Sequence, residues 1–255
     1  MAIGLAVAVL ERISSELHEM TKANKIAVVA GVGPGLGTAL CEKLTESGYC
    51  VAGIARSSAT GESLLKQLGA DRFVPVACDI SDPTAVNAAF ATVEQHFGAP
   101  DVYIHNVAGL LRQPFLETRP EQFETLWRSQ CLGAVYGAQR ALPAMLRGGN
   151  GTLLFIGATA SVKPGAHFSA FGVAKSALRG LAQSLARELG PQGIHVAHLI
   201  IDGVLWGERA RDAFGMGPEA CLQPDAVAQT CMHLIEQDRS AWTMEIDIRP
   251  DREAF

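Results

Sequence analysis

The sequence predicts an α/β fold in which helices cover both faces of a doubly wound parallel sheet of about seven strands. Short apolar runs, typical of buried strands, alternate along the chain with longer segments whose apolar residues recur every three or four positions. A glycine-rich stretch also stands between the first apolar run and the first helical pattern. Together these observations indicate repeated strand–helix units rather than hairpins.

Seven apolar runs predict the strands. They cover residues 25–31, 49–55, 73–79, 101–106, 152–157, 194–201 and 242–248. Helical patterns predict helices at 35–47, from Ser81 or Asp82 to Gly98, at 118–146 and at 169–189. Strands that alternate with helices should run parallel in one sheet.

Capping residues indicate where two of these helices begin. Ser81 or Asp82 can cap a helix that has Pro83 in its first turn. Thr118 and Glu121 fit a capping box at the start of the helix over 118–146.

We expect a single domain over residues 25–255, preceded by an extension over residues 1–24. We expect residues 5–20 to form either an extra amphipathic helix or a loose extension. The N-terminal apolar run, about 10 residues long, is too short to span a bilayer. Neither Lys nor Arg precedes it, which argues against a secretory signal.

Charge and cysteine usage narrow the classes of function. The net charge is only -5, and no basic stripe indicates nucleic-acid binding. The cysteines are scattered without a CxxC pair, at positions 41, 50, 78, 131, 221 and 231. This pattern predicts buried reduced thiols and a cytoplasmic protein, and we expect no metal site.

The glycine-rich stretch over residues 30–37 is a candidate phosphate-binding turn. Its glycines are Gly31, Gly33, Gly35 and Gly37, with Leu36 between the last two. Without Cβ atoms the backbone can approach a pyrophosphate, and the following helix N-terminus favours negative charge. A plain tight turn is the alternative, but the position between strand and helix favours nucleotide binding.

The residues after the second strand predict the cofactor. An acidic residue there would bind a ribose with free hydroxyls, but the chain has Arg56 followed by two serines. An arginine suits a 2′-phosphate by charge and hydrogen bonding, which favours NADP(H) over NAD(H). The alternative is that Arg56 is simply a solvated surface residue.

The order and spacing of the motifs resemble the short-chain dehydrogenase/reductase family, from Lys25 to about Ile248. The glycine stretch matches the family's TGxxxGxG with Ala30 in place of Thr. Residues 78–80 (CDI) and 106–109 (NVAG) match two further motifs, the second with Val107 in place of Asn. The resemblance implies a Rossmann-like fold and a dimer or tetramer formed through the helices at 118–146 and 169–189.

The resemblance also implies cofactor contacts beyond the glycine turn. Asp79 should meet the adenine, and Lys175 the nicotinamide ribose. After the sixth strand the family often has Pro-Gly, where this chain has Asp202 and Gly203. The remaining candidate cofactor-binding residues are Ile80, Asn106, Ala108, Gly109, Val204 and Leu205. The segment that covers the substrate in this family contains Trp206, Phe214 and Met216 here. These residues predict either an apolar substrate pocket or a lid that closes by packing on itself.

The catalytic positions depart from the family pattern of Asn, Ser, Tyr and Lys. Lys175 is present, but the Tyr position holds Phe171 and the Ser position Ala158. The Asn position falls on Cys131, which we expect to be a small core residue and not a nucleophile. Enoyl reductases place their Tyr seven residues before the Lys, where this chain has Phe168.

Three neighbouring residues are candidate substitutes for the missing proton donor. They are Thr159, Ser161 and His167, although each can also be an ordinary loop residue bonded to water or backbone.

Two hypotheses about function follow from these motifs. The chain is an NADP(H)-dependent oxidoreductase of a carbonyl or alcohol with an atypical proton donor, or a degenerate relative that binds NADP(H) as a sensor, scaffold or partner subunit.

Overall fold

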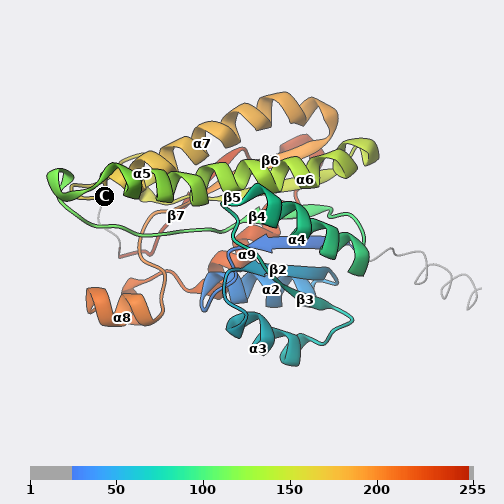
Figure 1. Cartoon of the computed structure of the whole chain (residues 1–255), viewed down its shortest axis with the longest axis horizontal. Coiled ribbons are helices and arrows are strands. Elements are labelled where there is room, and N and C mark those ends of the chain that lie inside the picture. Colours follow the sequence, from blue (N-terminus) through green and yellow to red (C-terminus); the bar gives the residue numbers. More distant parts are fainter. Residues whose placement is uncertain (1–24, 253–255) are drawn as a thin grey trace, which may run out of the picture.

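The computed structural model describes residues 25–252, so the helix expected within residues 5–20 lies outside the described part. Seven strands form one parallel sheet in the order β3-β2-β1-β4-β5-β6-β7 (Figure 1). The strands are β1 (Ile26–Ala30), β2 (Cys50–Ala55), β3 (Phe73–Ala77), β4 (Val102–His105), β5 (Gly151–Ile156), β6 (Ile194–Ile201) and β7 (Glu245–Ile248). The predicted fold class is confirmed, and six strands fall within the predicted ranges, while β5 begins one residue earlier, at Gly151.

Helices cover both faces of the sheet. They are α2 (Leu36–Glu46), α3 (Ala59–Leu68), α4 (Pro83–His96), α5 (Pro120–Trp127), α6 (Gly133–Gly148), α7 (Ser169–Leu189), α8 (Glu208–Phe214) and α9 (Pro224–Ile235). Residues of α4, α6 and α7 pack on one face of the sheet, and residues of α2, α3 and α9 on the other. Figure 1 shows α6 and α7 along the top of the molecule and α2 and α3 along the bottom. The sequence analysis had not predicted α3, α8 or α9.

The strands from β1 to β6 are mostly apolar because the sheet is buried on both faces, whereas the edge strand β7 (sequence EIDI) is partly exposed. In β4, Tyr103 packs into the core under α4 and α6, and Ile104 packs into the opposite core against α2 and α9. Every residue of β1 and of β6 is buried. Continuous burial explains why short uninterrupted apolar runs predicted these strands correctly.

The long helix predicted over 118–146 is not continuous. It is observed as α5, one π-helical turn over Arg128–Leu132, and α6. A π turn adds one residue to the local helical repeat, so the buried side of the segment is shifted within the turn. Gln130 and Cys131 both point into the protein at this place.

The predicted cap of this helix was wrong by one residue. The helix begins at Pro120, which has no N–H to leave unpaired, and the Arg119 N–H donates to the Gln122 side chain (2.9 Å). The Thr118 hydroxyl donates instead to the Pro114 carbonyl (2.9 Å). The Asp82 cap is confirmed, because its carboxylate accepts from the Thr84 N–H (2.8 Å).

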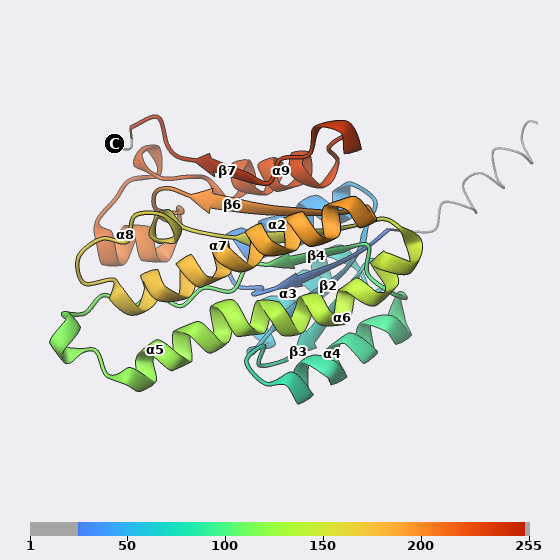
Figure 2. The same ribbon diagram turned by 90° about the horizontal axis from the view of Figure 1, so that it is seen from above.

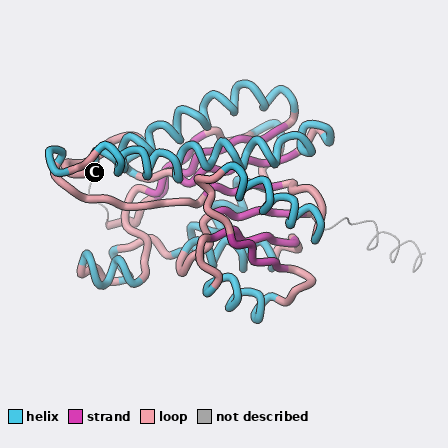
Figure 3. The backbone as a smooth tube through the Cα atoms, in the orientation of Figure 1, coloured by secondary structure: helices cyan, strands magenta, loops and turns pink. Residues whose placement is uncertain are grey.

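All strand carboxyl ends meet at one edge of the sheet because the strands are parallel, and we call it the carboxyl edge. Figure 2 shows the strand arrows pointing toward the side where α8 lies. The loops that leave the strands gather on this side (Figure 3). The strand order reverses between β1 and β4, and ligands of open α/β sheets bind in the crevice at such a reversal.

Two sequence expectations about the whole chain can be compared with the described residues. All six cysteines are buried, as predicted. Within residues 25–252, no helix combines the length and the apolar character needed to cross a bilayer.

Candidate active site

The glycine turn after β1 lies at the point of strand reversal. Gly31 has a φ of +95°, and a Cβ at this position would lie 2.8 Å from the Asn106 carbonyl. The Asn106 side chain donates to the Gly31 carbonyl (2.9 Å), and its N–H donates to Ala30 (2.8 Å). The turns after β1 and β4 are therefore fastened to each other at close range.

The other glycines of the turn have two different surroundings. A Cβ on Gly37 would lie 2.6 Å from the Gly31 carbonyl oxygen, so the first turn of α2 packs directly on the loop. A Cβ on Gly33 or Gly35 would meet no protein atom within 4 Å. Leu36 points into the core. The open space before the α2 N-terminus fits a pyrophosphate.

Arg56 and Asp79 follow β2 and β3 and are both exposed. The Asp79 carboxylate accepts from the Ser81 N–H (2.9 Å) and hydroxyl (2.7 Å). These bonds hold the pKa of Asp79 below its usual value, and the nearby Arg56 charge adds to the effect. Ile80 is buried, and a Cβ on Gly133 of α6 would lie 2.9 Å from its carbonyl oxygen.

Lys175 is buried on α7, with 2% of its surface exposed. Its ammonium group donates to the Ile156 carbonyl at the end of β5 (2.9 Å) and to the Val107 carbonyl after β4 (3.3 Å). Phe171 is also buried, and the Lys175 nitrogen lies 6.0 Å from its ring centre. Burial lowers the pKa of Lys175 to about 7. The two side chains therefore lie on one face of α7.

The turn over residues 157–161, which we call the β5 turn, follows β5 at the same edge. Ala158 is partly exposed, and its N–H donates to the Ser161 hydroxyl oxygen (3.1 Å). Ser161 itself is buried. Thr159 is partly exposed and donates to the buried Asp202 carboxylate. Of the hydroxyls in this turn, Thr159 is the one nearest to solvent.

Asp202 occupies the place where the resemblance expects proline. Lys163 and Arg249 each approach its carboxylate at 3.2 Å. These bonds to Thr159, Lys163 and Arg249 hold the pKa of Asp202 below its usual value, although its burial acts in the opposite direction. The carboxylate therefore remains ionised and links β6 to the β5 turn.

The segment after Asp202 makes backbone contacts with Leu222. Gly203 has a φ of +147°. The Val204 carbonyl accepts from the Leu222 N–H (2.9 Å), and Leu205 pairs with Leu222 in an isolated bridge. Val204 and Leu205 are partly exposed at the carboxyl edge.

Gln130 was missed by the sequence analysis. It lies beside Cys131 in the π turn, is fully buried and donates to the Gly109 carbonyl (3.1 Å). Cys131 is buried as well, and burial raises the pKa of its thiol. An amide within an otherwise apolar buried helix face was the available signal. Ala108, next to Gly109, is exposed.

His167 lies outside this buried cluster. Its side chain is exposed and its φ is +70°, unusual for a residue with a Cβ. Its carbonyl accepts from the Gln113 N–H (2.8 Å), which ties the loop before α7 to the loop after β4.

The arrangement of the glycine turn, Asn106 and Lys175 agrees with a comparison to known families. The profile described as short chain dehydrogenase matches residues 25–205. The chain belongs to the short-chain dehydrogenase family. A short-chain dehydrogenase from Rhodopseudomonas palustris is 34% identical, with a TM-score of 0.77, over 89% of this chain and 99% of that one.

Other members of the short-chain dehydrogenase family are more distant. A metagenomic short-chain oxidoreductase solved with NADP is 24% identical, with a TM-score of 0.76, over 89% of this chain and 97% of that one. An uncharacterized oxidoreductase of Staphylococcus aureus is 24% identical over 89% of this chain and 97% of its own length. Below 25% identity the structural likeness establishes the fold.

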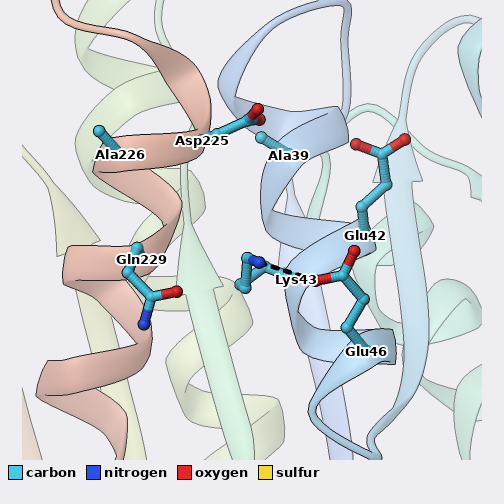
Figure 4. A pocket seen from close by; sticks show the side chains of 7 residues that line it. All are labelled: Ala39, Glu42, Lys43, Glu46, Asp225, Ala226 and Gln229. Carbon is cyan, nitrogen blue, oxygen red and sulfur yellow. Dashed lines mark hydrogen bonds and ion pairs between the residues drawn. The ribbon is translucent and has the colours of Figure 1, made fainter.

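This short-chain dehydrogenase also has a groove of about 370 Å³ between α2 and α9. Figure 4 shows Glu42, Glu46 and Asp225 around it, with Lys43 paired to Glu46 (2.7 Å). The groove lies along the flank of α2, beyond the first turn that faces the glycine loop. It is separate from the candidate active site.

Proposed function

We propose that this short-chain dehydrogenase is an NADP(H)-dependent oxidoreductase of a carbonyl or alcohol substrate, with an atypical proton donor. The observation that carries the proposal is the position of Lys175. Its buried ammonium group is held by the carbonyls at the ends of β4 and β5, at the same edge as the open glycine turn. The NADP bound to the metagenomic relative supports the choice of cofactor.

The cofactor would bind across the strand reversal. The backbone at Gly33 and Gly35 would face the pyrophosphate, Arg56 the 2′-phosphate, Asp79 the adenine and Lys175 the ribose near the nicotinamide. When bound, NADP(H) supplies the hydride transfer. Further backbone contacts would come from Ala108, Gly109, Gly203, Val204 and Leu205.

The proton must come from a group other than the residues at 158 and 171, because Ala158 and Phe171 have no exchangeable side-chain proton. Among the three substitutes, Ser161 is buried and His167 is exposed in a loop. Thr159 is the best placed, on the β5 turn at the carboxyl edge. Acid–base assistance is typically worth about 10² to 10⁴ in rate, so its loss would make carbonyl reduction slow.

The second candidate function is NADP(H) binding without efficient chemistry, as a sensor, scaffold or partner subunit. Ala158 and Phe171 favour it. A single-turnover experiment separates the two candidates: the protein is mixed with deuterium-labelled NADPH and a panel of aldehydes and diketones. Transfer of deuterium to carbon supports the oxidoreductase, and binding without transfer supports the second candidate.

Cofactor preference depends on Arg56. The unmodified protein should bind NADPH more tightly than NADH in parallel fluorescence titrations. Arg56→Ala should remove most of this difference, because the guanidinium is the cationic partner proposed for the 2′-phosphate. Arg147→Ala, at an exposed site on α6, should leave both affinities unchanged. Equal affinities in the unmodified protein would rule out the NADP assignment.

Restoring the expected proton donor should increase activity. Phe171→Tyr alone should restore little, because Ala158 would still leave the substrate oxygen unheld. Phe171→Tyr combined with Ala158→Ser should raise NADPH-dependent reduction of reactive diketones or aldehydes by at least about tenfold, a modest share of the general-acid effect. Strong activity in the unmodified protein that disappears in Phe171→Tyr would instead indicate a site of different design.

We also expect a homodimer or homotetramer formed through α5, α6 and α7, in the cytoplasm. Light scattering on the purified protein tests the oligomeric state directly.

A further inference from the structure

A chain of polar groups, partly buried at Arg179 and Glu245 and fully buried at His198, lies behind the β5 turn on the α7 side of the sheet. The Arg179 guanidinium donates two hydrogen bonds to the Glu245 carboxylate, at 2.7 and 2.6 Å. The same carboxylate accepts from Nδ1 of His198 (3.0 Å). His198 is fully buried on β6. The chain of polar groups therefore runs from α7 through the edge strand β7 to the neighbouring strand β6.

These contacts determine the tautomer of His198. A carboxylate can only accept hydrogen bonds, so the ring carries its proton on Nδ1. Burial lowers the pKa of His198, and the neighbouring positive charges of Lys175 and Arg179 act in the same direction against the opposing Glu245. The neutral ring therefore presents an acceptor lone pair on Nε2.

Nε2 faces the β5 turn. It has no hydrogen-bond partner among the described residues. A Cβ on Gly157 would overlap with Nε2 and lie 2.9 Å from the Ser161 hydroxyl oxygen. Because position 157 has no Cβ, the imidazole nitrogen and the hydroxyl both pack against the Gly157 backbone and lie near each other.

Ser161 has the complementary chemistry. Its oxygen accepts from the Ala158 N–H (3.1 Å), which leaves the hydroxyl proton to be donated. A buried acceptor without a donor is costly, typically by about 1–3 kcal/mol. A hydrogen bond from the Ser161 hydroxyl to His198 Nε2, reached by a small rotation of the serine side chain, would remove this cost.

We propose that His198 is a positioning residue, whose Nε2 accepts from the Ser161 hydroxyl and thereby holds the β5 turn against the sheet. Through this link, Glu245 and Arg179 fix the backbone of Ala158 and Thr159 at the substrate side. The same link steadies the Ile156 carbonyl on which Lys175 rests. The consequence for catalysis rests on the proposed function, whereas the hydrogen bond does not.

The hydrogen bond is tested by NMR of the protein labelled with ¹⁵N-histidine. The His198 signals, assigned by their loss in His198→Gln, should show a protonated Nδ1 and an unprotonated, hydrogen-bonded Nε2. Ser161→Ala should move the Nε2 resonance toward that of a free acceptor. Ser129→Ala, which removes a hydroxyl bonded within its own helix, should leave it in place. A protonated Nε2, or no response to Ser161→Ala, would overturn the proposal.

The positioning role is tested by single-turnover hydride transfer. His198→Phe retains the ring volume without the acceptor, and should slow transfer at least fivefold while NADPH affinity changes by less than about twofold. His198→Gln, which returns an acceptor near the Nε2 position, should recover most of the rate. Equal rates in His198→Phe and the unmodified protein would overturn the positioning role. If the unmodified protein transfers no hydride, the proposed function fails and the NMR result alone decides the hydrogen bond.

Discussion

Gly37→Val should abolish NADPH binding, with a loss of at least about a hundredfold in affinity. The valine Cβ alone would lie 2.6 Å from the Gly31 carbonyl oxygen and 2.8 Å from the Val32 Cα. Both neighbours are backbone, so the loop must move away from α2, and the cradle for the pyrophosphate is lost. Fluorescence titration with NADPH measures the effect, and circular dichroism shows whether the variant is folded.

Substitutions at two other glycines distinguish the loss of a cofactor contact from damage to the fold. Gly180→Val lies on α7, where a Cβ meets no atom within 4 Å, and should leave NADPH affinity unchanged. A Cβ on Gly33 is equally free of protein contacts, so any loss of affinity in Gly33→Ala reports a contact with the cofactor itself. An unchanged affinity in Gly37→Val would mean that the dinucleotide does not bind on this turn.

Lys175→Met should raise the free energy of unfolding by a few kcal/mol at pH 6.5, and by much less at pH 9.5. Burial lowers the pKa of Lys175 to about 7 from its ordinary value of 10.5. Between these values the unfolded chain holds a proton that the folded protein has released. The free energy of unfolding of the unmodified protein therefore rises with pH, and the advantage of methionine shrinks. Each pKa unit corresponds to about 1.36 kcal/mol, and the full cost is present below pH 7.

Urea unfolding at the two pH values measures this difference. Lys66→Met, at an exposed site on α3, serves as the control and should show a similar small change at both. The Met variant should also bind NADPH more weakly, because the cation proposed for the ribose is gone. A stability gain that is independent of pH would show that the ammonium group is not desolvated as the structure indicates.

The strands could be predicted because the sheet is buried on both faces. Residues such as Tyr103 and Ile104 pack into opposite cores, so the run is apolar without interruption. The location of the candidate site followed from chain order, since parallel strands bring Gly31, Asn106 and Lys175 to one edge. The fastening of Asn106 to Gly31 needed coordinates, because the two residues are far apart in sequence.

Other features could not be read from local patterns. The apolar spacing continues through Arg128–Leu132, and no proline or glycine within this segment marks the π turn. The direction of Gln130 depends on that single inserted residue. The relation of His198 to Gly157 depends on the register of β5 against β6, in which Phe155 pairs with His198. Only the assembled sheet determines such distances.

Because all six cysteines are buried, the reactivity of each thiol can report local unfolding of the structure around it. Cys41 lies on α2, Cys50 on β2, Cys131 in the π turn and Cys231 on α9. A thiol reagent reaches a buried thiol only when the surrounding structure opens, so each labelling rate measures the opening of one region. Mass spectrometry of labelled peptides would thus show which side of the sheet opens first. Bound NADPH should slow the labelling of Cys41 more than that of Cys231, because α2 begins at the glycine turn.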